Sequence, residues 1–172
     1  MRVAKGIIDV DTKVERGTIF TIKLPLTLAI NRSLLVYAGK QVLAFPLTNI
    51  VEVISMDPQR IQRMQKQEVI LVRGEVLPLY HLANILNIKA SQLTETQISV
   101  VIVGYGEKRF GFVVDNLIGE QEIVIKSLGD FIGHIPGLAG STILGDGRVA
   151  LILDIRGLIN LARVNLNNEL AS

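Results

Sequence analysis

The chain has 172 residues, which fits one domain or two small domains that share a core. Hydrophobic residues make up 49% of the sequence but aromatic residues only 5%, so Val, Ile and Leu must form the core, and no apolar run approaches the roughly 18–20 residues of a membrane span. The formal net charge is +2, with scattered basic residues and no cysteine, which excludes a basic stripe along a phosphate backbone, a disulfide scaffold and thiolate metal sites.

Residues 6–24 are predicted to form a β-hairpin. Residues 7–11 and 18–24 are strand candidates, the second with clear alternation of polar and apolar residues, and residues 14–17 form the turn between them. Pro25 ends regular pairing. Because an isolated hairpin is marginal in water, it either packs on the residues downstream of it or belongs to the edge of a larger domain.

From residue 34 onward, short apolar runs alternate with glycine turns. The predicted hairpins pair residues 34–38 with 42–46, 69–72 with 76–80, 99–103 with 109–114, and 141–144 with 149–153. In the last of them, the Asp146-Gly147 pair supplies the positive φ that a tight turn requires. This spacing is typical of small β-barrels.

Three segments are predicted to be helical. Residues 57–67 are polar, with Asp57 as a possible N-cap and a proline at the first helical position. Residues 81–87 and 155–162 each follow a strand as short helices, residues 90–96 form a linker, and the chain frays after residue 164.

The second half of the chain repeats the first. At an offset of 67 residues (103 − 36 = 67), Val36, Gly39, Phe45 and Asn49 correspond to Val103, Gly106, Phe112 and Asn116. At an offset of 73 (147 − 74 = 73), Gly74, Val76, Leu79 and Leu82 correspond to Gly147, Val149, Ile152 and Ile155. Barrels this small bury little core alone, so we expect two that pack on each other as a pseudo-twofold pair with a groove between them.

Residues of the kinds used in catalysis are present but not in catalytic patterns. His81 and His134 have no second ligand at metal spacing, so both are interpreted as surface or structural histidines. Residues 104–109 lack the third glycine of a nucleotide loop and join two strands, which favours a hairpin turn. The acidic pairs Asp146 with Asp154 and Glu120 with Glu122 are interpreted as ordinary turn and strand acids.

Four stretches of the sequence resemble one known family. Residues 44–54 resemble its P-L-x-x-V-x-E-V strand and turn, and residues 69–79 (VILVRGEVLPL) its R-G-E-x-x-P-L hairpin. Residues 111–129 (GFVVDNLIGEQEIVIKSLG) and 137–154 (GLAGSTILGDGRVALILD) match two more of its segments almost throughout, with Ser141 where alanine is more usual. The chain therefore resembles the C-terminal regulatory, CheW-like domain of the chemotaxis histidine kinase CheA.

The resemblance implies a mainly β fold of two SH3-like barrels related by pseudo-twofold symmetry, with a few short helices. Residues 1–30 would be the end of the kinase ATP-binding domain and its connector, since residues 16–30 (RGTIFTIKLPLTLAI) resemble its last strand. Residues 31–164 would be the regulatory domain, with repeats at about 34–89 and 98–162, and residues 165–172 a tail. How the strands are shared between the barrels is left open.

The same resemblance implies a fragment of a longer kinase, because the ATP-binding boxes and the phosphorylated-histidine domain of the family are missing. Met1 would then be an artificial start. The fragment would hold no catalytic residue, cofactor or metal of its own, and ATP and magnesium would belong to the kinase domain of the parent protein. Its implied role is cytoplasmic docking to the CheW adaptor and the chemoreceptor tip in membrane receptor arrays, without membrane insertion or nucleic-acid binding.

Docking is expected to use apolar side chains beside turns near the barrel ends, with plain core packing as the alternative for each. The candidates are Ile50, Val53, Ile54, Leu117, Ile118, Phe131, Ile132, Ile135 and Leu138. Three rival readings remain: a free-standing CheW-type adaptor, against which residues 1–24 argue; a small enzyme with a site in the inter-barrel groove, against which the missing nucleophile argues; and an SH3-like RNA-binding protein, which would need a basic aromatic face.

Overall fold

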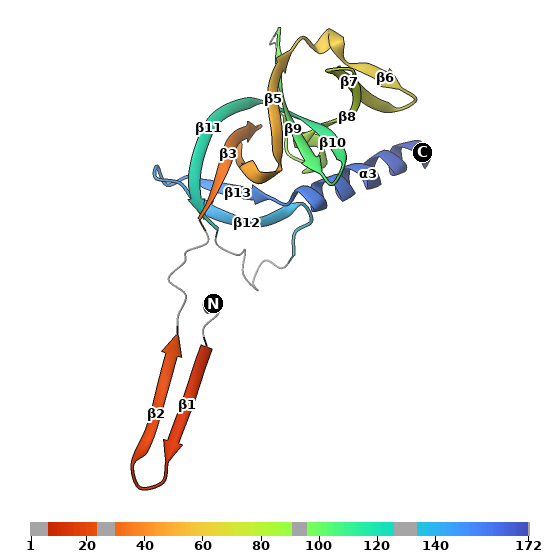
Figure 1. The fold of residues 1–172 in the computed structure, drawn as a ribbon. Helices are drawn as coiled ribbons and strands as arrows, with labels where there is room; N and C mark the ends of the chain where they lie inside the picture. Colours follow the sequence, from red (N-terminus) through yellow and green to blue (C-terminus); the bar gives the residue numbers. More distant parts are fainter. Residues whose placement is uncertain (1–6, 24–29, 91–95, 126–133, 172) are drawn as a thin grey trace.

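The computed structural model describes residues 7–23, 30–90, 96–125 and 134–171. They form a separate hairpin and two larger sheets (Figure 1). The hairpin pairs β1 (Ile7–Lys13) with β2 (Gly17–Lys23), as predicted, and every residue of both strands is exposed. Neither strand pairs with another described strand.

The two larger sheets contain the remaining strands. In spatial order, the six-stranded sheet consists of β5 (Ile50–Met56), β9 (Ile98–Tyr105), β10 (Lys108–Val114), β8 (Glu75–His81), β7 (Gln67–Val72) and β6 (Gln62–Met64). The five-stranded sheet consists of β11 (Asn116–Val124), β3 (Ile30–Ala38), β4 (Gln41–Pro46), β13 (Val149–Leu153) and β12 (Leu138–Ile143). The helical elements are the 3-10 turns η1 (Leu47–Asn49) and η2 (Pro58–Arg60) and the helices α1 (Leu82–Ile85) and α3 (Ile155–Ala171).

Each sheet combines strands from both halves of the chain. We call β3 to β8 with α1 the first repeat and β9 to β13 with α3 the second. The β3–β4 hairpin of the first repeat lies between β11 and β13 of the second, and the β9–β10 hairpin of the second lies between β5 and β8 of the first. Neither large sheet is therefore built from one repeat alone. Each sheet is made by strands of both repeats, which answers how the strands are shared between them.

The backbone register confirms the internal repeat. Strand β4 pairs in parallel with β13 through Ala44 and Ile152, and β10 pairs in parallel with β8 through Gly111 and Leu79. Each residue of the second pair is the repeat counterpart of one in the first (111 − 44 = 67 and 152 − 79 = 73). The two parallel junctions between the repeats are thus equivalent, as pseudo-twofold symmetry requires.

The main core lies where the two repeats meet. Phe45 and Phe112, both fully buried repeat counterparts, have ring centroids 6.1 Å apart. The first repeat adds further members such as Val36 and Leu82, and the second adds Val103 and its helix α3. Two smaller clusters fill the two sheets, and each again contains residues of both repeats.

The predicted helix over residues 57–67 is wrong beyond its first turn. Asp57 does cap Pro58–Arg60, accepting a hydrogen bond from the backbone of Gln59 at 2.8 Å. The chain then forms β6, which pairs antiparallel with β7, so sheet pairing overrides a weak helical preference.

The last helix is longer than predicted. It ends at Ala171 instead of 162, so the chain does not fray after residue 164. Leu158, Ala162 and the half-buried Leu166 continue one apolar face at i, i+4 spacing. Near the end of the helix, Lys66 donates to the main-chain oxygen of Glu169 at 2.7 Å. The Lys66 contact joins the far end of the helix to the first repeat.

The hairpin turns also follow the repeat, with one exception. Gly39 and Gly106 occupy equivalent positions with φ of +59° and +63°, and each is the first central residue of a two-residue turn, as in type II′. The turn at Gly147 was predicted to need a positive φ at the Asp146-Gly147 pair. Gly147 does have a φ of +85°, but Leu144 and Arg148 enclose a three-residue loop, in which only Gly147 has positive φ.

The two equivalent glycines provide a matched test of the fold. A Cβ at Gly106 would meet nothing within 4 Å, whereas a Cβ at Gly39 would overlap the main-chain oxygen of Lys89. We expect Gly106→Ala to cost only the left-handed backbone penalty, about 1–2 kcal/mol. Gly39→Ala should cost about 1–3 kcal/mol more, the usual range for overpacking. Denaturant unfolding of both variants measures the difference, and equal losses would contradict the packing at Gly39.

Candidate functional site

The outer strands β5 and β11 share an irregularity that exposes an apolar side chain. The pairing of β5 with β9 shifts between Ile50 and Glu52, and the pairing of β11 with β3 shifts at the equivalent place, between Leu117 and Gly119. The residue left over in each bulge is Val51 in one strand and Ile118 in the other, 46% and 38% exposed. Bulges on edge strands discourage further strand pairing. They leave an exposed side chain as the element that a partner can contact.

On β5, the predicted candidates divide between surface and core. Val53 is 38% exposed. Ile50 and Ile54 are half-buried, Ile50 against the main core and Ile54 against the core of the six-stranded sheet. Their partial exposure leaves both roles available to them.

The candidates of the second repeat give a similar division. Leu117 is 38% and Ile135 36% exposed, so both are accessible with Ile118. The placement of Leu138 on the docking surface is corrected, because this side chain is only 9% exposed and belongs to the main core. Leu138 pairs there with Leu153 on β13. Phe131 and Ile132 lie outside the described residues.

Several exposed apolar residues were missed by sequence reasoning. Val51 is the repeat counterpart of Ile118 (118 − 51 = 67), so the repeat itself carried the signal that could have identified it. Two cross-strand pairs at hairpin ends were also missed: Leu71 with Val76, and Ile143 with Val149, all between 52% and 62% exposed. Val76 and Val149 are again repeat counterparts.

Ion pairs link the outer strands to their neighbours. Arg73 of the β7–β8 turn lies 3.1 Å from Glu52 on β5, and Arg32 on β3 lies 3.1 Å from Glu120 on β11. Both arginine side chains are largely exposed, so each ion pair adds little stability. Glu120 is therefore a surface strand acid, as interpreted from the sequence.

The turn acid Asp146 is held by its own hairpin. The backbone and the side chain of Arg148 donate to its carboxylate at 3.0 and 2.6 Å. These hydrogen bonds, the backbone one first, lower the pKa of Asp146 and favour its ionised form. The guanidinium also lies over the Tyr37 ring, 5.7 Å from its centroid. The arrangement fastens the β12–β13 turn to the β3 strand.

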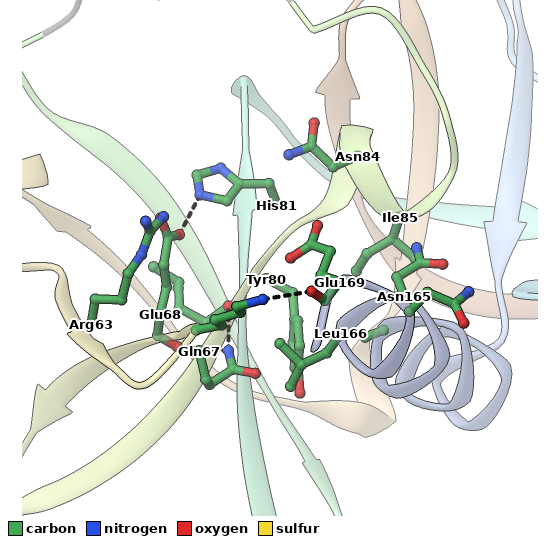
Figure 2. Close-up of a pocket in the computed structure, with 14 residues that line it drawn as sticks. Arg63, Gln67, Glu68, Tyr80, His81, Asn84, Ile85, Asn165, Leu166 and Glu169 are labelled. Carbon is green, nitrogen blue, oxygen red and sulfur yellow. Dashed lines mark hydrogen bonds and ion pairs between the residues drawn. The ribbon is translucent and has the colours of Figure 1, made fainter. Parts of the chain in front are cut away.

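A cavity of about 410 Å³ lies between the β6–β7 hairpin, β8, α1 and α3 (Figure 2). Within it, Glu68 contacts Arg63 at 3.3 Å and His81 at 2.7 Å, so His81 is a partnered side chain, as the sequence indicated. Tyr80 also lines the cavity, and its burial raises the pKa of its phenol. The described lining contains no Ser, Thr or Cys that could act as a nucleophile beside His81.

The described residues lack two further features. They contain no group of three or more acidic, histidine or cysteine side chains that could hold a metal ion. No helix among the described elements is both long and apolar enough to cross a membrane.

Comparison with known families gives one clear match. The model of the CheW-like domain matches residues 32–163. Among solved structures, the scaffolding protein TtCheW from Thermoanaerobacter tengcongensis aligns with a TM-score of 0.64, covering 74% of this chain and 91% of that one. Its sequence identity is only 15%, so this likeness concerns the fold.

Similar sequences come from bacterial chemotaxis proteins. The chain is 43% identical over 157 residues to the chemotaxis protein CheA of Treponema pallidum and 37% identical over 158 residues to the sensor histidine kinase CheAY of Helicobacter pylori. These matches cover 91% and 92% of this chain but only 19% and 20% of the relatives. The chain thus spans about a fifth of the length of the curated relatives that it matches.

The burial pattern predicts that two aspartate substitutions differ widely in their cost to stability. Leu138→Asp would bury an unpaired charge and should destabilise the fold by more than about 3 kcal/mol. Val51→Asp places the charge at an exposed bulge and should cost less than about 1 kcal/mol. Thermal melts of the two variants check this, and an unfolded Val51→Asp would show that the bulge residue is needed for packing.

Proposed function

The chain belongs to the family of CheW-like domains, and on this premise we propose that it is the regulatory docking module of a bacterial chemotaxis histidine kinase. The observation that carries the proposal is its similarity to kinases named CheA over nine-tenths of its length. In this proposal the module binds partners and transmits their state, while ATP, magnesium and phosphoryl transfer belong to other domains of the parent protein. It would work in the cytoplasm and be recruited to membrane receptor arrays.

The extent of the matches favours a kinase domain over a free-standing adaptor. The family model begins at residue 32, and the match to CheAY covers 158 of 172 residues. Even if the remaining 14 residues (172 − 158 = 14) all lay at the N-terminus, the match would include β2, upstream of the CheW-like region. At least the β2 segment of the hairpin is therefore matched in the sensor histidine kinase CheAY, which supports the kinase assignment.

We further propose that residues 1–30 belong to the end of the ATP-binding domain that precedes the regulatory domain. One face of the hairpin carries Ile8 opposite Ile22 and Val10 opposite Phe20, all between 58% and 67% exposed. A two-stranded hairpin with such a face needs a third element to be stable in water. The rest of a kinase domain would supply that element.

The partners in this proposal are the CheW adaptor and the cytoplasmic tip of chemoreceptors. Specific interfaces derive most of their binding energy from a few desolvated apolar side chains surrounded by polar ones. The bulge residues Val51 and Ile118 fit that role, each with an ion-paired acid nearby on its strand. The remaining surface candidates are Ile50, Val53, Ile54, Leu117 and Ile135.

Binding to recombinant CheW tests the docking proposal. We expect Val51→Asp or Ile118→Asp to weaken binding at least about tenfold, equivalent to about 1.4 kcal/mol, while the melting temperature stays close to that of the wild type. Calorimetric titration measures the affinity. A matched control is Val14→Asp, which charges a 91% exposed valine in the hairpin turn and should bind normally. Wild-type affinity in both bulge variants would exclude this surface.

The domain boundary is tested by truncation. Because β1 and β2 pair with no other described strand, removal of residues 1–29 should leave the melting temperature of the remaining domain nearly unchanged. Differential scanning calorimetry of the two chains checks this. A drop of more than about 4 °C, which corresponds to about 1 kcal/mol for a domain of roughly this size, would mean that the hairpin stabilises the sheets.

A further inference from the structure

The exchange of strands between the repeats makes each repeat incomplete alone. Without the second repeat, the β3–β4 hairpin loses its neighbours β11 and β13, and without the first, the β9–β10 hairpin loses β5 and β8. Both sides of each central hairpin would then present unpaired N–H and C=O groups. Such edges associate readily with any complementary strand.

The apolar core has the same dependence. The core of the five-stranded sheet combines Leu35, Val42 and Ala44 of the first repeat with Ile123 and Ile152, among others, of the second. The core of the six-stranded sheet divides in the same way. A single repeat would therefore expose faces that are fully buried in the assembled molecule.

Helix α3 adds a further junction between the repeats, and this junction is polar at the far end of the helix. The helix follows β13 of the second repeat, and its buried Leu158 packs in the main core with Leu82 of the first repeat. Lys66 of the first repeat donates a hydrogen bond to the main-chain oxygen of Glu169 on α3, at a distance of 2.7 Å. The cavity beside this contact is lined by residues of both repeats.

We propose that the two repeats are obligate partners that associate as two separate molecules would. Residues 30–90 and 96–171 then form one folded unit through their interface alone, and the peptide connection between them serves only to raise their local concentration. The partner that fits each exposed repeat is the other repeat, from the same chain or from a second copy. This inference is independent of what docks on β5 and β11.

Cleavage of the folded chain tests the proposal. A protease site inserted after Ala90 lets the full-length protein fold before it is cut. We expect the two pieces to elute together from a size-exclusion column and to melt in one transition. The melting temperature of the cut protein should rise with its concentration, because unfolding now releases two molecules, while that of the uncut chain should not change.

Separation and remixing complete the test. Each piece is isolated in denaturant and returned to buffer, where it should either precipitate or show no cooperative unfolding transition. Mixing the two pieces during refolding should restore the melting transition of the original protein. When cut chains with and without an affinity tag on the first repeat are refolded together, the tagged piece should capture second repeats from both copies in proportion to the mixture.

Two results would overturn the proposal. One is a cooperative, concentration-independent transition in either isolated piece, which would mean that a repeat folds alone. The other is separation of the cut pieces in native buffer, which would mean that the covalent connection is required. Binding of CheW by the uncut chain would be unaffected by either result, so failure here does not bear on the docking proposal.

Discussion

The structure depends on the two parallel junctions at which one repeat completes the sheet of the other. At Ala44 with Ile152, and at Leu79 with Gly111, strands distant in sequence share hydrogen bonds in equivalent registers. Parallel pairing cannot be made by a hairpin, so it needs a long connection between the two strands. Here the strands that pair in parallel come from different repeats, so the chain between the repeats provides that long connection. Phe45 and Phe112, which follow Ala44 and Gly111 in their strands, are buried against each other.

The docking surface is a consequence of the same symmetry. Once the central hairpins are enclosed by the other repeat, the strands β5 and β11 become equivalent outer strands. Their shared bulge leaves Val51 and Ile118 exposed while their neighbours Ile50 and Leu117 pair with Val103 and Val36. A surface made this way occurs twice, once on each sheet.

Much of this fold could be predicted from the sequence, because strand alternation and glycine turns are local signals. The hairpins and the repeat follow from the spacing of residues such as Gly39 and Gly106. The exchange of strands could not be predicted, since it depends on contacts between residues from 32 (111 − 79) to 108 (150 − 42) positions apart, such as Leu79 with Gly111 and Val42 with Ala150. The same limit explains the errors at residues 57–67 and at Leu138, where sheet pairing and burial override the local pattern.

The point at which the chain enters the folded body has a mechanical consequence. The first strand after the hairpin is β3, whose first residue, Ile30, pairs with Val124 at the end of β11. From there the ladder runs antiparallel as far as Tyr37 opposite Asn116. A displacement of Ile30 along the strand axis loads all these hydrogen bonds at once, in shear, and does not peel them apart one by one. A pull on β3 from its N-terminal end would therefore act directly on β11, the strand that carries Ile118.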